Sequence, residues 1–261
     1  SLDANTTGGR NTAIGRVSLS SNTTGGDNVS IGRSALTSNS TGCKNVAVGY
    51  GALLSNTEAN DNIAVGYQSL EQNTTGTSNI GYSALYSNTT ADNNTAVGSQ
   101  ALCTNTTGAH NVAVGARAGD ANTTGTQNTF VGGDYNGGPG GANTTGGCNT
   151  FIGNDSGMKN TTGSFSTSVG AESSCNGTTS HSNAALGYKA LKLLTTGNHN
   201  VAIGREAMIS NTTGTRNTGI GAYALYGNTT AEANTAVGYS ALETNTTGSY
   251  NTAVGTLALD T

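Results

Sequence analysis

Residues 245–261 read N-T-T-G-S-Y-N-T-A-V-G-T-L-A-L-D-T, and this motif is the main sequence evidence for the fold because it recurs along the whole chain. When the sequence is aligned on the first residue of this motif, fifteen repeats follow one another, and twelve of the fourteen intervals equal the one from Asn5 to Asn22. The repeats begin at Asn5, Asn22, Asn39, Asn56, Asn73, Asn88, Asn105, Asn122, Asn143, Asn160, Gly177, Leu194, Asn211, Asn228 and Asn245. So strict a period is typical of a solenoid, in which each unit buries its apolar side by stacking on its neighbours.

The repeat unit favours β-structure over helix. Seventeen residues are too few for the paired helices of an α-solenoid, and the unit carries Gly and β-branched residues in place of helix formers. We therefore predict an all-β fold, a β-solenoid of about 15 coils that forms one continuous domain over residues 1–261. Successive coils of such a solenoid lie about 4.8 Å apart.

The tenth position of the repeat decides where the core is expected. We align an aliphatic residue there in every repeat: Ile14, Ile31, Val48, Val65, Ile80, Val97, Val114, Val131, Ile152, Val169, Leu186, Ile203, Ile220, Val237 and Val254. A column that keeps its character through the chain is expected to point inward, together with the β-branched residue two positions earlier.

Ala-Leu pairs, such as Ala35-Leu36, form a second apolar column later in the repeat. The Leu position of this column is lost in the middle of the chain, at Gly119, Gly157 and Ser174. We interpret three nearby aromatic residues as replacing the lost core volume: Phe130, Phe151 and Phe165.

Gly and Asn occupy the expected corners of the coil. Gly follows the aliphatic residue, as at Gly49, and a corner that needs a positive φ would select Gly there. Asn at the first and seventh positions can adopt left-handed backbone geometry, and stacked Asn side chains can pair in ladders along the axis.

Two repeats depart from the usual length. The fifth, which begins at Asn73, is shorter than the others by two residues, and we place these missing residues before Ile80, in a short deletion near residues 79–81. The eighth, which begins at Asn122, is longer by four residues and carries a Gly-rich insertion loop within residues 132–142. Asp134 and Asn136 of this loop carry oxygen atoms that could bind a cation weakly, but we prefer a plain bulge and predict no metal site.

Charged residues are scarce, with 10 basic and 14 acidic side chains and a net charge of −4. The basic residues form no cluster, which argues against a nucleic-acid partner. The apolar runs are too short to span a bilayer, so no membrane span is expected. The sequence contains no Ser-His-Asp or paired-carboxylate grouping. We therefore predict no catalytic residue and no cofactor, and we do not expect an enzyme.

The run N-T-A-V-G-x-x-A, as in Asn94 to Ala101, resembles the head repeats of trimeric autotransporter adhesins. Similar Asn-Thr-Ala-Val-Gly arrays occur in phage tail-fibre proteins, and the resemblance covers nearly the whole chain. It implies a left-handed β-roll in an extracellular fibre on a cell surface or virion surface, commonly as a homotrimer. The repeat of this chain is longer and carries an added Thr-Thr-Gly corner.

The Asn at the start of most repeats lies in an acceptor sequence for N-glycosylation. Twelve first-position residues qualify: Asn5, Asn22, Asn39, Asn73, Asn88, Asn105, Asn122, Asn143, Asn160, Asn211, Asn228 and Asn245. One interpretation is a glycan-coated fibre, and the other is that these residues only form corners. A spacing of about 4.8 Å leaves little room for a branched glycan on every coil.

Tyrosines and cysteines complete the candidate residues. We assign Tyr50, Tyr67 and Tyr82 to the twelfth position of successive coils, where they form a stacked surface stripe that stiffens the rod or binds sugars or a partner. The four Cys fall at three different repeat positions, in coils or columns too far apart for a bridge, so we expect no internal disulfide.

These features together predict a structural or adhesive subunit or segment of an extracellular or virion-surface fibre. Neither end of the sequence carries a capping unit, so we expect end-to-end stacking or a longer chain. The expected partners are further copies of the chain, stacked end to end or as a homotrimer, and glycans or a host surface. The alternative is an ice-binding or carbohydrate-binding solenoid, in which the Thr-Thr pairs supply a Thr column.

Overall fold

The computed structural model describes residues 1–133 and 137–260, and every regular element in these ranges is a β-strand. Each repeat contributes one strand of three residues, fifteen in all. The prediction of an all-β solenoid with a 17-residue repeat is therefore confirmed. The chain forms two compact units, Ser1–Gln127 and Asn128–Thr261, and each is described by itself. The single continuous domain stays a prediction.

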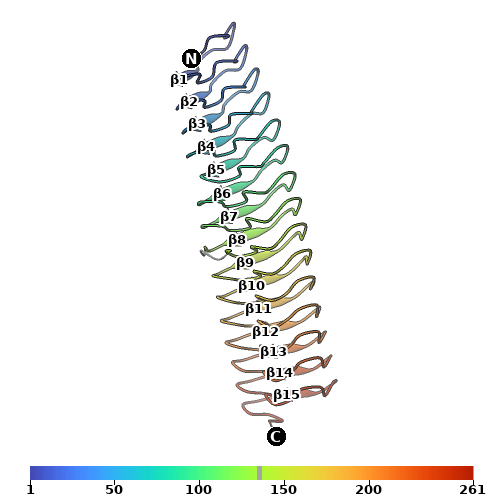
Figure 1. Cartoon of the computed structure of the whole chain (residues 1–261). Helices are drawn as coiled ribbons and strands as arrows, with labels where there is room; N and C mark the ends of the chain where they lie inside the picture. The colour runs from blue at the N-terminus through green and yellow to red at the C-terminus, as the bar shows by residue number, and fades with distance from the viewer. Residues whose placement is uncertain (134–136, 261) are drawn as a thin grey trace. The chain divides into compact units, whose positions relative to one another are not determined.

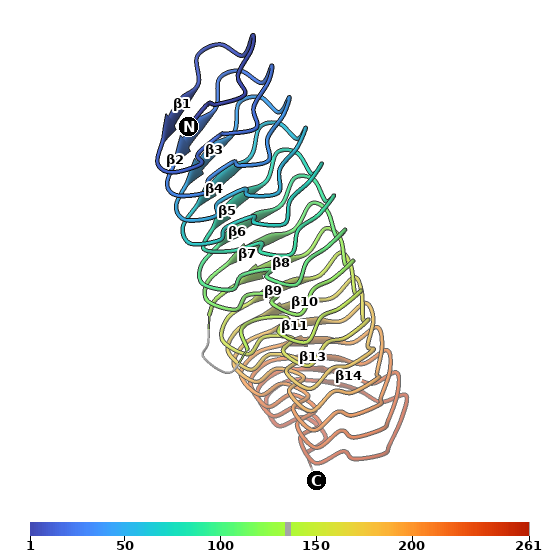
Figure 2. The same ribbon diagram turned by 45° about the horizontal axis from the view of Figure 1, so that its top comes forward.

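The strands of each unit pair in chain order as a parallel ladder (Figure 1). The first unit contains β1 (Thr12–Ile14), β2 (Val29–Ile31), β3 (Val46–Val48), β4 (Ile63–Val65), β5 (Ile80–Tyr82), β6 (Thr95–Val97) and β7 (Val112–Val114). The second contains β8 (Thr129–Val131), β9 (Thr150–Ile152), β10 (Thr167–Val169), β11 (Ala184–Leu186), β12 (Val201–Ile203), β13 (Thr218–Ile220), β14 (Thr235–Val237) and β15 (Thr252–Val254). Within each unit, turns complete every coil beside the ladder (Figure 2).

The register of the strands places the ninth position of the repeat inside the coil. In β3, Ala47 is fully buried, whereas Val46 and Val48 on either side of it are only half-buried. Ile14 and Ile203, both at the tenth position, are 58% and 39% exposed. The prediction that the tenth-position column points inward is therefore wrong. Because side chains alternate along a strand, the eighth and tenth positions share the outer face.

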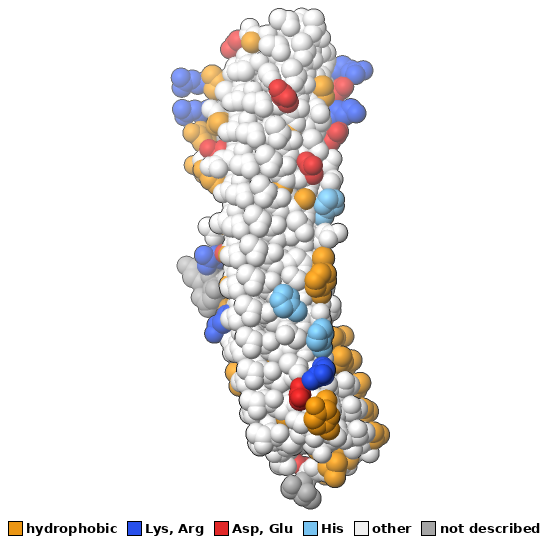
Figure 3. All heavy atoms as spheres, turned by 90° about the vertical axis from the view of Figure 1, so that its right-hand side faces the viewer, with side chains coloured by type: hydrophobic (Ala, Val, Ile, Leu, Met, Phe, Trp, Pro, Cys, Tyr) orange, Lys and Arg blue, Asp and Glu red, His pale blue; other side chains and the backbone are white. Residues whose placement is uncertain are grey.

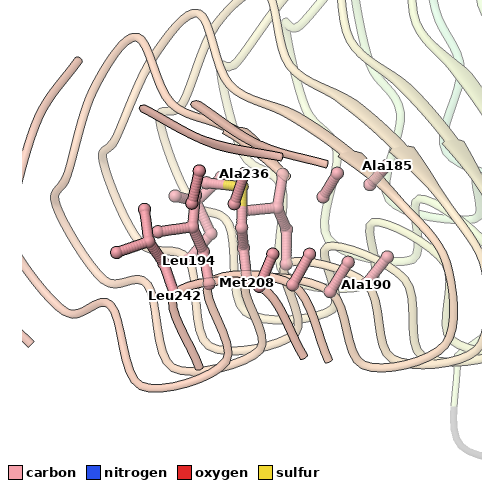
Figure 4. Close-up of a cluster of buried hydrophobic side chains, with 13 residues drawn as sticks. Ala185, Ala190, Leu194, Met208, Ala236 and Leu242 are labelled. Atoms are coloured by element: carbon pink, nitrogen blue, oxygen red, sulfur yellow. The ribbon is translucent and has the colours of Figure 1, made fainter. Parts of the chain in front are cut away.

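The core between the walls of each coil is narrow. Small residues at the ninth and fourteenth positions face the long side chain at the fifteenth, as Ala202 and Ala207 do around Met208 in the second unit. Figure 4 shows Leu194, Met208 and Leu242 pointing into the coil, with Ala185, Ala190 and Ala236 beside them. A branched aliphatic on the strand would compete with the fifteenth-position side chain for this volume, because protein interiors are close-packed.

In two coils of the second unit, the large side chain lies at the ninth position and the small residue at the fifteenth. Phe130 and Phe151 occupy the ninth position and are buried, and the fifteenth position of their coils is Gly140 and Gly157. A Cβ atom on Gly157 would lie 2.6 Å from the Phe151 ring. The interpretation that Phe replaces lost core volume is confirmed for these two residues. It is wrong for Phe165, which is 66% exposed at the sixth position.

The backbone reaches positive φ at fixed points of the coil. Gly49, at the eleventh position, has a φ of 138°, and a Cβ atom there would lie 2.3 Å from the carbonyl oxygen of Gly66 in the next coil. Left-handed non-Gly residues occur at the sixth, thirteenth and fifteenth positions, such as Lys44, Gln68 and Leu36. The first- and seventh-position Asn residues do not adopt this geometry, contrary to our expectation.

The structure describes the short fifth repeat completely and the long eighth repeat in part. Ile80 pairs with Ile63, and Tyr82 pairs with Val65 and Val97, so the two missing residues follow β5 and do not precede Ile80. In the insertion loop, Asp134 and Asn136 lie outside the described residues. The regular coil has resumed by Gly140, whose N–H donates to the carbonyl of Ser156.

Candidate functional site

Two ladders of Asn side chains run through the interior of each unit, as the sequence suggested. In the second unit, Gly177 and Leu194 interrupt the first-position ladder, and Ser166 replaces one Asn of the seventh-position ladder. At the first position, the amide nitrogen of Asn39 donates to Oδ1 of Asn22 at 2.8 Å and to the carbonyl of Gly42 at 3.0 Å. At the seventh position, Oδ1 of Asn28 accepts from the backbone N–H of Asn45 at 3.0 Å. These amides satisfy buried backbone groups that a coil this thin would otherwise leave unpaired.

The first-position ladder does not fit the expected glycosylation. Ten of the twelve candidate Asn residues are buried, and the exceptions are Asn5, which is exposed, and Asn245, which is half-buried. A glycan is attached at the amide nitrogen, and in Asn39 and Asn73 both hydrogens of that nitrogen are used inside the fold. Of these twelve residues, only Asn5 and Asn245 could therefore carry a glycan in the folded chain.

The Thr-Thr pair beside this ladder is divided between the interior and the surface. The hydroxyl of Thr23, at the second position, donates to the carbonyl of Ser40 in the next coil at 3.0 Å. Thr24, at the third position, is exposed. The pair therefore presents a single rank of Thr side chains to solvent.

The outer face of each ladder forms a further continuous surface of one kind. We call the eighth- and tenth-position side chains of a unit its outer sheet face. Ile63 and Val114 on this face of the first unit are 40% and 39% exposed. Five of the seven eighth-position residues there are aliphatic. No eighth- or tenth-position side chain of either unit is charged. These side chains form an uncharged and largely apolar strip along each ladder.

The outer sheet face of the second unit has a different composition. Six of its eight eighth-position residues are Thr: Thr129, Thr150, Thr167, Thr218, Thr235 and Thr252. The tenth position beside them is aliphatic in every strand, from Val131 to Val254. Hydroxyl-bearing and aliphatic columns therefore run side by side along this ladder. Sequence reasoning missed both outer faces because it pointed the tenth position inward.

The predicted Tyr stripe is only partly assembled. The rings of Tyr50 and Tyr67 stack with centroids 5.3 Å apart and planes 11° apart, and the guanidinium of Arg33 lies 5.6 Å from the centre of the Tyr50 ring. Tyr82 lies instead in β5, at the tenth position, so its assignment to the twelfth position is wrong. The stack of Arg33, Tyr50 and Tyr67 therefore ends at the short coil.

The titratable groups do not gather into a catalytic centre in the described ranges. None of the four cysteines, all of which lie in the described ranges, forms a disulfide. Burial raises the pKa of the Cys103 and Cys175 thiols, which makes them poor nucleophiles. Hydrogen bonds from Arg216 and Tyr250 hold the pKa of the partly exposed Glu232 carboxyl below its usual value. No group of three or more His, Cys, Asp or Glu residues is placed to hold a metal within residues 1–133 and 137–260.

The distribution of charged and hydrophobic side chains on the surface does not indicate a particular class of partner. Figure 3 shows one face, on which charged side chains lie scattered and hydrophobic side chains follow one another along the lower right margin. In the part of the chain that the structure describes, no helix is long and apolar enough to cross a bilayer. No model of a known protein family matches this chain, and no curated protein matches it.

Proposed function

We propose that this chain is a structural or adhesive segment of an extracellular fibre, on a cell surface or virion surface. In this proposal, copies of the chain associate side by side through their outer sheet faces as a homotrimer. The observation that carries the proposal is the uncharged, branched aliphatic column that each ladder turns toward solvent. Ile14 at 58% exposure and Leu186 at 39% are examples.

A further copy of the chain is the partner that fits this surface best. The side chains of the face repeat once per coil, about 4.8 Å apart, and a second copy carries columns with the same spacing. Aliphatic side chains of parallel copies can therefore interdigitate along the whole of each ladder. Closed cyclic symmetry is the usual arrangement of homo-oligomers, and a three-fold axis would enclose the aliphatic columns of three copies.

The test replaces two aliphatic side chains of the first unit by Lys, in the double variant Val97→Lys/Val114→Lys. The matched control, Thr90→Lys/Thr107→Lys, adds the same charge to the exposed third position of the same coils. Sedimentation velocity should give a species near three times the 25.8 kDa chain mass for the natural protein and the control. The Val97→Lys/Val114→Lys variant should sediment as a monomer with an unchanged circular dichroism spectrum. A monomeric natural chain, or a variant that still associates, would contradict the proposal.

Ice binding is a second candidate, and the outer sheet face of the second unit favours it. Thr hydroxyls and aliphatic side chains alternate there in regular columns, which can order water on a flat surface. The variant Thr218→Lys/Thr235→Lys should abolish thermal hysteresis measured at millimolar protein. The control Thr213→Lys/Thr230→Lys, at the third position, should keep it. Absence of thermal hysteresis in the natural chain would end this candidate.

A further inference from the structure

The short fifth coil leaves a depression in the surface of the first unit. The two residues missing after Tyr82 would have formed the corner of the coil, and the corners on either side belong to full-length coils. The depression has a volume of about 560 Å³. Its lining includes Tyr67, Gln68, Ser83, Tyr86, Ser99 and Gln100.

One wall of the depression is the open face of a tyrosine ring. Tyr50 is covered by Arg33 on one side and Tyr67 on the other, and it is 42% exposed. Tyr67 is 68% exposed, because the coil that should supply the next twelfth-position residue lacks one. The next residue of that column is Ser99, two coils away, or roughly 9.6 Å at the usual strand spacing.

The missing corner also leaves a backbone acceptor without its partner. In the regular coils, the thirteenth-position N–H donates to the twelfth-position carbonyl of the preceding coil, as Gln68 does to Tyr50 at 2.9 Å. In the short coil, Ser83 takes over part of this ladder: its N–H donates to Val65, and its carbonyl accepts from Gln100 at 3.1 Å. Within the described residues, no backbone N–H donates to the carbonyl of Tyr67.

The remaining polar groups of the lining are neutral. They include the side-chain amides of Gln68 and Gln100 and the hydroxyls of Ser83 and Ser99. Amides and hydroxyls both donate and accept hydrogen bonds, and no charged side chain lines the depression. A ligand with a flat apolar face and a rim of hydroxyl groups therefore matches this lining.

We propose that this depression binds one neutral pyranose residue of a glycan. The apolar face of the sugar ring stacks on Tyr67 and continues the column of Arg33, Tyr50 and Tyr67. Van der Waals contacts of about 4 Å on each side of the ring would fill the space between Tyr67 and Ser99. The hydroxyl groups bond to Gln68, Gln100 and the carbonyl of Tyr67. Aromatic walls with a few convergent polar groups are typical of small-molecule sites.

The probes for this site are methyl glucoside, methyl galactoside and methyl mannoside, measured by saturation-transfer NMR and isothermal titration calorimetry on the full chain. At least one should bind with a Kd on the order of 1 mM. Inserting Gly-Ser between Tyr82 and Ser83 restores the length of the coil, fills the depression and removes none of its lining residues. This insertion and Tyr67→Ala should each weaken binding at least about tenfold, or about 1.4 kcal/mol. The matched control is Tyr188→Ala, because Tyr188 occupies the same repeat position in the second unit.

Several outcomes would overturn the proposal. They are no binding of any of the three glycosides at concentrations on the order of 50 mM, unchanged binding by the insertion variant, or an equal loss in Tyr188→Ala. Tighter binding of adenosine than of all three glycosides would also contradict it, because a nucleobase would then be the ring that stacks on Tyr67. The proposed fibre does not depend on this site, because association is measured by sedimentation without sugar.

Discussion

Inside the first unit, Asn45 forms hydrogen bonds to the coil before it and to the coil after it. Its Oδ1 accepts from the N–H of Asn62, its amide nitrogen donates to the carbonyl of Ala59 at 2.8 Å, and its own N–H donates to Asn28. The variant Asn45→Ala leaves the buried N–H of Asn62 without an acceptor, and it removes one of the two hydrogen bonds to the carbonyl of Ala59, which keeps its bond from Asn56. We expect the free energy of unfolding in urea, followed by circular dichroism, to fall by roughly 1–3 kcal/mol.

Thr41→Ala is the matched control for this variant, because Thr41 is exposed in the same coil. Its free energy of unfolding should stay within about 0.5 kcal/mol of the natural chain. An equal loss in the two variants would show that the Asn ladder does not stabilise the fold.

Phe151 and Gly157 place the large residue at the ninth position and the small one at the fifteenth, and this arrangement gives a prediction about the core of the second unit. Phe151→Ala should lower the free energy of unfolding by about 3–5 kcal/mol, because it opens a cavity. Gly157→Leu should also destabilise the fold, because its Cβ atom would lie 2.6 Å from the Phe151 ring. Gly157 has a φ of 58°, and Leu53 adopts nearly the same φ, 51°, at the equivalent position. The double variant Phe151→Ala/Gly157→Leu should therefore be more stable than the sum of the two single losses predicts.

The measurement is a double-mutant cycle in urea, with a coupling of about 0.5–3 kcal/mol in favour of the double variant. Losses that simply add would mean that the two positions do not share one volume.

Glu71 gives a prediction about pH. Burial raises the pKa of its carboxyl above the usual value, although a hydrogen bond from Gln68 acts the other way, and Oε2 is buried without a partner. The folded chain therefore binds this proton more tightly than the unfolded chain, so the ionised carboxylate destabilises the fold above its raised pKa. At pH 7, Glu71→Gln should have a higher melting temperature than the natural chain. The difference should shrink as pH falls through that raised pKa and vanish below about pH 4.3. A difference that does not change with pH would contradict this account.

At the scale of the strand, the sequence predicts the existence of each element but not which way it faces. The fifteen strands all fall in the aligned repeats, because the period of the sequence is unmistakable. In a three-residue strand, either the central side chain or the two outer side chains can point into the core, and the strand itself is the same in both cases. Hydrophobicity favoured the branched residues for the core, as at Val46 and Val48, but the narrow coil has room only for Ala47. The pairing of Phe151 with Gly157 was the signal in the sequence that the ninth position faces inward.

The same uncertainty about which face of the strand is buried led to the wrong position for the deletion in the fifth repeat. The depression that this deletion leaves was therefore not predicted. Aligning Ile80 with the inward aliphatic column put the missing residues before the strand and moved Tyr82 to the wrong position. Once Ile80 is placed at the eighth position, the missing corner lies after β5. The depression beside Tyr67 could therefore not be predicted from the sequence, although Tyr67 itself was singled out there.

The short coil gives a prediction at the scale of one element. Inserting Gly-Ser between Tyr82 and Ser83 supplies the backbone N–H that the carbonyl of Tyr67 lacks, so the melting temperature should stay the same or rise. Inserting the same pair between Gly98 and Ser99 lengthens a coil that is already complete. It should lower the melting temperature by several degrees, since backbone hydrogen bonds to neighbouring coils are lost. Equal effects of the two insertions would contradict the assigned position of the deletion.

At the scale of the molecule, charge contributes little, and this decides how the chain should respond to salt. The ion pairs between described residues, such as Arg10 with Asp27 and Arg216 with Glu232, join partly or largely exposed side chains. Exposed pairs contribute about 0–1 kcal/mol each and are screened by salt. Backbone ladders, Asn ladders and the narrow apolar core are insensitive to screening. The stability of each unit should therefore change little between low and high sodium chloride.

Lateral association should respond to salt in a way that identifies the surface responsible. If copies meet through the outer sheet faces, sodium sulfate should strengthen association because it favours burial of apolar surface. Sodium chloride should not weaken it, because the face carries no charge to screen. Sedimentation velocity across a series of each salt measures both effects, and the Val97→Lys/Val114→Lys variant should not associate in either. Dissociation of the natural chain by sodium chloride would instead assign the contact to the scattered charged side chains and exclude the outer sheet face.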